Sequence, residues 1–125
     1  MRIRSRWLLS SLASLLLAGM AGAAPPCGVL LGGYLEDHDG EVVPCLVDLQ
    51  EDALCFGLED MTVNTATRTL DAHLQAQGVP RPVWDTTPAG NATRVNTESG
   101  DRLEVVLAAD GAFTTMGTCR IVYER

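Results

Sequence analysis

The sequence predicts an α+β fold, a curved antiparallel sheet with one helix packed on it. Short segments rich in β-branched residues alternate with glycine-containing turns, a pattern typical of antiparallel strands. One segment, residues 63–77, instead repeats apolar residues at helical spacing. The expected element order is therefore β-β-β-α-β-β-β. A small OB-like β-barrel, which carries a helix in a comparable place, is the alternative architecture.

The first half of the domain predicts a hairpin followed by a third short strand. Residues 27–37 and 41–49 are apolar and partly β-branched, and Asp39-Gly40 between them tolerates the positive φ that tight hairpin turns require. Pro44 lacks the N–H that a sheet ladder needs, which predicts an edge strand or a bulge. Residues 53–58 are expected to form the third strand.

The predicted helix covers residues 63–77. Its threonines favour a strand by propensity, but a second pattern outweighs them. Apolar side chains recur at helical spacing at Val63, Ala66, Leu70 and Leu74. Gly78 then supplies a natural C-cap.

The rest of the chain predicts a loop and a meander. Residues 79–91 hold three prolines and no periodicity, which predicts a loop. Residues 92–98, 102–109 and 113–124 have strand patterns and are separated by Ser-Gly and Asp-Gly pairs. Such pairs are typical of tight turns between antiparallel strands.

The first 23 residues have the pattern of a secretory signal peptide. Arginines open the chain, an apolar stretch follows, and Ala21 and Ala23 complete an A-x-A cleavage pattern. We expect cleavage after Ala23 and a single disulfide-stabilised domain over residues 24–125. The apolar stretch is short for a membrane span, so the sequence predicts a periplasmic or secreted protein without a membrane span in the mature chain.

Four cysteines follow the predicted cleavage point: Cys27, Cys45, Cys55 and Cys119. An even number in an exported chain predicts disulfides. The spacings contain no C-x-x-C, so neither a redox motif nor a zinc ribbon is suggested. We favour Cys45–Cys55, which closes a short loop, with Cys27–Cys119, which ties the start of the domain to its last strand. Each bridge is expected to stabilise the fold by about 2–4 kcal/mol.

The charge of the chain excludes several classes of partner. No lysine is present, and after signal removal six arginines face sixteen acidic residues, a formal net charge of −10. Such a surface repels nucleic acid and anionic lipid, because both are polyanions. Basic proteins and divalent cations are the partners that it favours.

The residues predict neither an enzyme nor a cofactor. Ser99, the only serine after the signal, lies in a turn-like T-E-S-G-D segment without the G-x-S-x-G elbow. The cysteines are expected to be oxidised, which removes their thiolates. No lysine is present for a Schiff base, and no glycine-rich loop suits a phosphate.

The acidic segment at residues 35–45 supplies most of the candidate binding residues, namely Asp37, His38, Asp39 and Glu41. A calcium loop starting at Asp37 would need glycine at its sixth position and glutamate at its twelfth, where this chain has Val42 and Asp48. One histidine with flexible carboxylates does not make a selective transition-metal site, so we assign no metal site. Two interpretations remain: a surface that steers a basic partner, or a solvated hairpin tip whose charges protect a strand edge.

Trp84 is the other candidate binding residue. It is the only tryptophan after the signal and lies in the proline-rich segment P-R-P-V-W-D-T-T-P. Prolines reduce the entropy lost on binding, and tryptophan is frequent among the residues that dominate interfaces. Trp84 is therefore a candidate anchor for a partner. The alternative is that the indole folds back and fills the core.

Two functional hypotheses follow. In the first, the protein is a small exported acidic binding module that inhibits or neutralises a basic envelope-active protein, such as a cell-wall hydrolase or a toxin. In the second, it is a periplasmic protein that binds a small ligand or a divalent cation. Small size, disulfides, strong acidity and the lack of recognisable catalytic motifs favour the first hypothesis.

Overall fold

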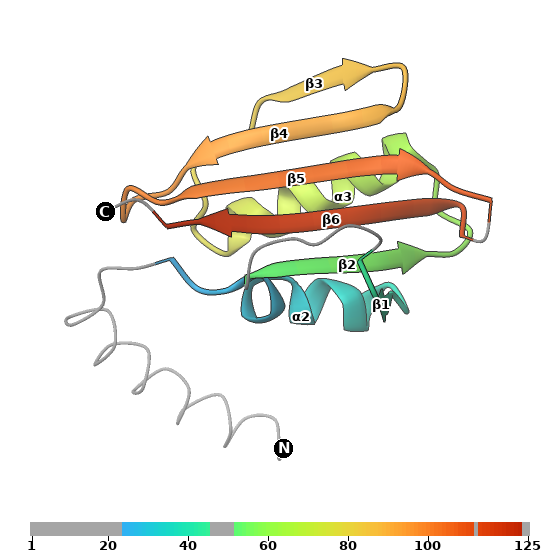
Figure 1. Ribbon diagram of the computed structural model, residues 1–125, viewed down its shortest axis with the longest axis horizontal. Helices are drawn as coiled ribbons and strands as arrows, with labels where there is room; N and C mark the ends of the chain where they lie inside the picture. The colour runs from blue at the N-terminus through green and yellow to red at the C-terminus, as the bar shows by residue number, and fades with distance from the viewer. Residues whose placement is uncertain (1–23, 46–51, 112, 124–125) are drawn as a thin grey trace, which may run out of the picture.

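The fold combines two helices with a six-stranded antiparallel sheet (Figure 1). It is described from a computed structural model, for residues 24–45, 52–111 and 113–123. The predicted signal peptide and parts of the predicted strands 41–49 and 113–124 lie outside these ranges. The α+β class predicted from the sequence is confirmed.

The elements follow one another in the order α2 (Cys27–Asp37), β1 (Glu41–Val43), β2 (Ala53–Leu58), α3 (Val63–Ala76), β3 (Trp84–Thr87), β4 (Gly90–Asn96), β5 (Arg102–Ala109) and β6 (Thr115–Val122). The strands are arranged as β1-β2-β6-β5-β4-β3, and each neighbouring pair is antiparallel. Because β1 and β3 lie at opposite edges, the sheet is open. This excludes the OB-like barrel.

The prediction of a strand over residues 27–37 is wrong, because this segment forms the helix α2. Its buried side chains are Cys27, Leu30, Leu31, Tyr34 and Leu35. They recur at intervals of three and four residues, which is the period of a helix that buries one face. The observed order is therefore α-β-β-α-β-β-β-β, with two helices rather than one.

The predicted hairpin turn at Asp39-Gly40 is the C-terminal end of α2. Asp39 has a φ of 52°, so the expectation of positive φ holds at this residue, but in a helix end. The N–H of Gly40 donates to the carbonyl of Leu35 at 2.7 Å, and that of Asp39 donates to the carbonyl of Glu36 at 3.5 Å. These two bonds form a Schellman motif, which satisfies the last carbonyls of the helix and turns the chain into β1.

The prediction of an uninterrupted loop over residues 79–91 is also wrong, since Trp84–Thr87 form β3. Its tryptophan and two threonines favour a strand. Prolines at 80, 82 and 88 flank it, and an edge strand tolerates such neighbours because one side of it makes no ladder.

The remaining elements are confirmed. Helix α3 begins at Val63, where the hydroxyl of Thr62 accepts the N–H of Thr65 at 3.2 Å, and Gly78 caps its end with a φ of 90°. Strand β5 has the predicted bounds, and β2, β4 and β6 lie within two residues of theirs. Strand β1 lies at an edge, as predicted, but it ends at Val43, before Pro44, instead of continuing through the proline.

Both helices pack on one face of the sheet, which we call the inner face. Helix α3 contacts β4 and β5, while α2 contacts β2, β6 and α3; in Figure 1, α3 passes behind β5 and β6, and α2 lies along β2. The largest side chains of this core are Tyr34, Phe56, Leu31, Leu58, Leu70, Leu74, Leu103, Leu107 and Ile121. Gly117 makes room for them, because a Cβ there would collide with the ring of Phe56 on the neighbouring strand.

Two disulfides join Cys27 to Cys119 and Cys45 to Cys55, with Cα–Cα distances of 6.0 and 5.3 Å. This is the predicted pairing. The first attaches the N-terminal residue of α2 to β6 in the interior of the sheet. Two disulfides fit a protein of an oxidising compartment.

The backbone nitrogen of Ala24 is held by a buried carboxylate. It donates to Oδ2 of Asp101 at 3.0 Å, and the hydroxyl of Ser99 donates to the same oxygen at 3.1 Å. Ala24 and Asp101 are only 9% and 4% exposed. If the signal is removed after Ala23, this nitrogen becomes an α-ammonium group, and the hydrogen bond becomes a buried ion pair.

We therefore expect Asp101→Asn to destabilise a chain that begins at Ala24 by about 3 kcal/mol, because the buried ammonium loses its counter-charge. Urea unfolding measures this loss. The matched control carries one added residue before Ala24, so that the same nitrogen is an uncharged amide. There the substitution should cost about 1 kcal/mol. Equal losses in the two chains would contradict the ion pair.

Candidate functional site

Three chain connections meet at one end of the sheet: α2–β1, β2–α3 and β5–β6. They meet because the register places Glu41 opposite Gly57, and Thr115 opposite both Leu58 and Ala109. The connections and the ends of their elements carry seven exposed carboxylates: Glu36, Asp37, Asp39, Glu41, Glu59, Asp60 and Asp110. We call this set the acidic end.

The four residues predicted from the acidic segment all lie at this end. Asp37 is the last residue of α2, His38 is its C-cap, Asp39 follows with positive φ, and Glu41 begins β1. Sequence reasoning missed the other half of the acidic end, in the β2–α3 and β5–β6 connections. Only the pairing of β2 with β6 and of β6 with β5 brings these distant segments together.

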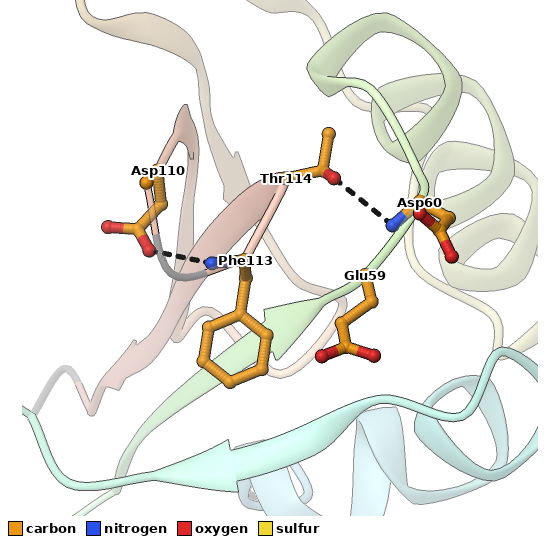
Figure 2. A pocket seen from close by; sticks show the side chains of 6 residues that line it. Glu59, Asp60, Asp110, Phe113 and Thr114 are labelled. Carbon is orange, nitrogen blue, oxygen red and sulfur yellow. Dashed lines mark hydrogen bonds between the residues drawn. The ribbon is translucent and has the colours of Figure 1, made fainter.

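An open hollow of about 330 Å³ lies within the acidic end, between the β2–α3 and β5–β6 connections (Figure 2). Its lining residues are Glu59, Asp60, Asp110, Gly111, Phe113 and Thr114. The N–H of Asp60 donates to the hydroxyl of Thr114 at 3.1 Å, and the N–H of Phe113 donates to Oδ2 of Asp110 at 3.0 Å. The first bond joins the two connections, and the second holds the carboxylate of Asp110 against its own connection.

Phe113 places an apolar ring among these charges. Figure 2 shows the ring between the carboxylates of Asp110 and Glu59. The ring packs over Gly57 of β2, where an added Cβ would collide with it. The aromatic side chain is thus half-buried and held by the sheet, yet it still faces the hollow.

Helix stability does not explain the carboxylates at the end of α2. Glu36 and Asp37 lie in its last turn, where the partial negative charge of the helix dipole disfavours an acidic side chain by about 0.3–1 kcal/mol. Glu59 and Asp60 differ, because they precede α3 and so lie near the favourable end of its dipole. The charges at the end of α2 are therefore the stronger indication of a function.

The two histidines pack against Tyr34 of α2. The ring centroids of His38 and His73 lie 4.5 and 5.6 Å from that of Tyr34, and Nε2 of His73 lies 2.8 Å from the carbonyl oxygen of Leu30. Burial raises the pKa of Tyr34, although its hydrogen bond with Thr69 partly opposes this. Among the described residues, no group of three or more His, Cys, Asp or Glu side chains lies close enough to hold a metal ion.

Trp84 does not share a site with the acidic segment, because β3 and β1 are at opposite edges of the sheet. Its side chain is half-buried against the core, and its Nε1 donates to Oδ1 of Asp71 on α3 at 2.9 Å. This is the alternative arrangement, in which the indole folds back. It attaches the edge strand β3 to the helix layer.

The arginines gather elsewhere. On the outer face of the sheet, which is opposite the helices, Glu104 lies within 3.4, 2.9 and 2.6 Å of Arg94, Arg102 and Arg120. Burial tends to raise the pKa of Glu104, but hydrogen bonds from Arg120 and Arg102 outweigh it and hold the pKa below its usual value. Three of the five arginines in the described ranges thus surround one carboxylate.

Comparison with known proteins adds no relative. No protein-family model, no curated protein and no solved structure matches this chain. Within the part of the chain that the structure describes, no helix has the length and apolar character needed to cross a membrane.

We expect Glu104→Gln to lower the free energy of unfolding at neutral pH by about 1 kcal/mol, because one exposed and two partly buried arginines lose their shared counter-charge. The pKa of Glu104 is lower in the folded chain. Its contribution is therefore present above the unfolded pKa of about 4.3 and is lost as the pH falls through the folded value.

Urea unfolding of the unchanged protein and of Glu104→Gln, at neutral and at strongly acidic pH, measures the difference between their free energies of unfolding. This difference should disappear in acid. Glu98→Gln, an exposed substitution in the β4–β5 turn, serves as the control and should have little effect at either pH. A difference of the same size at both pH values would contradict the role of the Glu104 charge.

Proposed function

We propose that this chain is a small exported binding module that docks a basic protein through its acidic end. The observation that supports this most strongly is the segregation of charge. Seven exposed carboxylates extend from three connections that carry no arginine in the described ranges, while three arginines gather around Glu104 on the outer face.

Clustering of like charges explains why a basic partner is favoured. Carboxylates that share one end of a small domain repel one another, and a cationic surface relieves this repulsion on binding. The same field attracts a basic partner over several ångströms and raises the association rate, an effect that salt screens. Electrostatic complementarity of this kind supplies specificity and rate more than affinity.

Phe113 supplies an apolar contact, which the carboxylates cannot provide. Affinity at interfaces comes mainly from a few well-packed aromatic or arginine side chains surrounded by polar contacts. The ring of Phe113 is held over Gly57 and lines the same hollow as Glu59, Asp60 and Asp110. It therefore has the character of an apolar anchor with an acidic rim.

The chemistry of the acidic end favours, as partner, an enzyme that acts on an anionic envelope polymer. Such an enzyme needs a basic substrate cleft, and a rigid acidic surface can occupy that cleft in place of the polymer. The disulfides and the signal-like N-terminal sequence support export to the compartment where such enzymes act. Inhibition or neutralisation of a basic envelope-active protein is thus the proposed role.

The second hypothesis, a small-ligand or divalent-cation protein, has less support. The acidic hollow has the charge for a cation, but no set of three ligands lies together in the described ranges. Thermal unfolding with calcium, zinc or copper tests it, because a ligand that binds only the folded state raises the melting temperature.

We expect the variant Asp39→Asn/Glu41→Gln to bind its basic partner about tenfold more weakly, a loss of about 1.4 kcal/mol. Asparagine tolerates the positive φ of residue 39, so the backbone is preserved. Capture from envelope extract at low and high salt, with mass spectrometry of the bound proteins, identifies the partner. Titration of that partner then gives the affinity.

The matched control is Asp85→Asn/Glu98→Gln, which removes the same charge from exposed positions outside the acidic end. It should change the affinity less than twofold. Capture of no basic protein at either salt concentration would overturn the proposal, as would equal losses in the two variants.

A further inference from the structure

The helix layer on the inner face stops short of strand β1. Against the sheet, helix α3 makes its main contacts with β4 and β5, and α2 makes its main contacts with β2 and β6. On β1, Val42 lies opposite Phe56, so its side chain belongs to the inner face, yet it is 60% exposed. An apolar edge of the inner face is thus left open beside α2.

A groove of about 400 Å³ occupies this place. Its apolar lining comes from Leu35 of α2, Val42 of β1 and Leu54 of β2, and Gly28 and Gly32 form the wall along α2. Glu36 and Asp39, two members of the acidic end, also line it. The groove is therefore apolar along its length and acidic at one end.

The two glycines are not required by the packing of the chain itself. A Cβ at Gly28 or Gly32 would meet nothing within 4 Å, whereas a Cβ at Gly57 or Gly117 would collide with a phenylalanine ring. Glycine inside a helix is unfavourable relative to alanine. The space above these two residues is therefore open.

We infer that this groove receives an amphipathic basic helix of the partner protein. This rests on the proposed function, since the acidic end selects the charge of the partner. The apolar side chains of that helix would pack on Leu35, Val42 and Leu54, and its lysines or arginines would face Glu36 and Asp39. Binding of this kind, in which a helix lays its apolar face in a groove, is a general mode of peptide recognition.

The dimensions of the groove agree with such an occupant. The helical stretch from Gly28 to Asp37 runs for nearly three turns, or about 14 Å. Glycines allow a neighbouring helix to approach α2 closely, because no side chain separates the two backbones. The partner helix would then continue the layer formed by α3 and α2 across β1. A strand added to β1 itself would find little to pair with, because β1 has three residues and Pro44 follows it.

The test uses two synthetic peptides of leucine and lysine with the same composition. In the first, the leucines recur at positions i, i+3, i+4 and i+7, so that they form one face of a helix. In the second, the same residues are scrambled so that no such face forms. Fluorescence anisotropy measures the binding of both to the mature, disulfide-bonded protein.

Gly32→Leu adds a side chain to the wall of the groove, at a position where a Cβ meets nothing within 4 Å. We expect it to weaken binding of the amphipathic peptide at least about tenfold while the melting temperature stays equal or rises. Binding of the scrambled peptide should change less than twofold. Ala72→Leu adds the same side chain to an exposed position of α3 outside the groove, and it should leave both peptides unaffected.

The outcomes separate the groove from the acidic end. If Gly32→Leu binds the amphipathic peptide as the unchanged protein does, the groove is not the docking site, and the proposed function remains. If the two peptides bind the unchanged protein equally, the protein does not recognise an amphipathic helix. The inference about the groove then fails, and the proposed function remains. If Asp39→Asn/Glu41→Gln weakens neither peptide, the acidic end does not select basic partners, and the proposed function itself is overturned.

Discussion

The position of α2 is the constraint on which the rest of the structure depends, and the Cys27–Cys119 disulfide sets it. A helix of 11 residues with three glycines is too short and too weak in propensity to persist alone. The disulfide joins its first residue to β6, and Leu31 and Tyr34 bury the rest against the inner face. Because the bridge closes a long stretch of chain, it constrains the unfolded state strongly in the entropic account.

Once α2 is held in this way, two features of the surface follow. Its C-terminal end brings Glu36, Asp37 and Asp39 beside the β2–α3 and β5–β6 connections, which completes the acidic end. Its flank beside β1 leaves the groove. Neither feature serves stability, since acidic residues at a helix C-terminus and glycines in a helix interior are both unfavourable. Solvent-facing features that lower the stability of the fold are expected where a surface is adapted for binding.

Local patterns were enough to predict β5, α3 and the disulfide pairing, because each depends on residues near in sequence or on a simple choice among pairings. Residues 27–37 were assigned wrongly because the run of apolar residues and glycines resembled a bent strand, although the spacing of its leucines with Tyr34 is helical. The acidic end was found only in part. Asp37 to Glu41 are contiguous, but Asp110 joins them through the register of β2, β6 and β5, which no local pattern contains. The position of Trp84 was ambiguous for the same reason. Its hydrogen-bond partner Asp71 is on α3, and the sequence does not show that α3 packs beside the edge strand β3.

The two interpretations of the acidic segment are compatible once β1 is seen as an edge strand. An unpaired strand edge attracts other strands, and nearby charges oppose this. Glu41 projects toward the outer face, opposite Gly57, whereas Val42 projects toward the groove, opposite Phe56. Carboxylates therefore separate two apolar contacts, Phe113 on one side of the edge and the groove on the other. A second copy of this acidic chain would be repelled from the edge by its own charge, whereas the proposed cationic partner would reach both contacts without that penalty. The charges that keep the edge from pairing with its own kind are thus the same charges that, in the proposed function, select a basic partner.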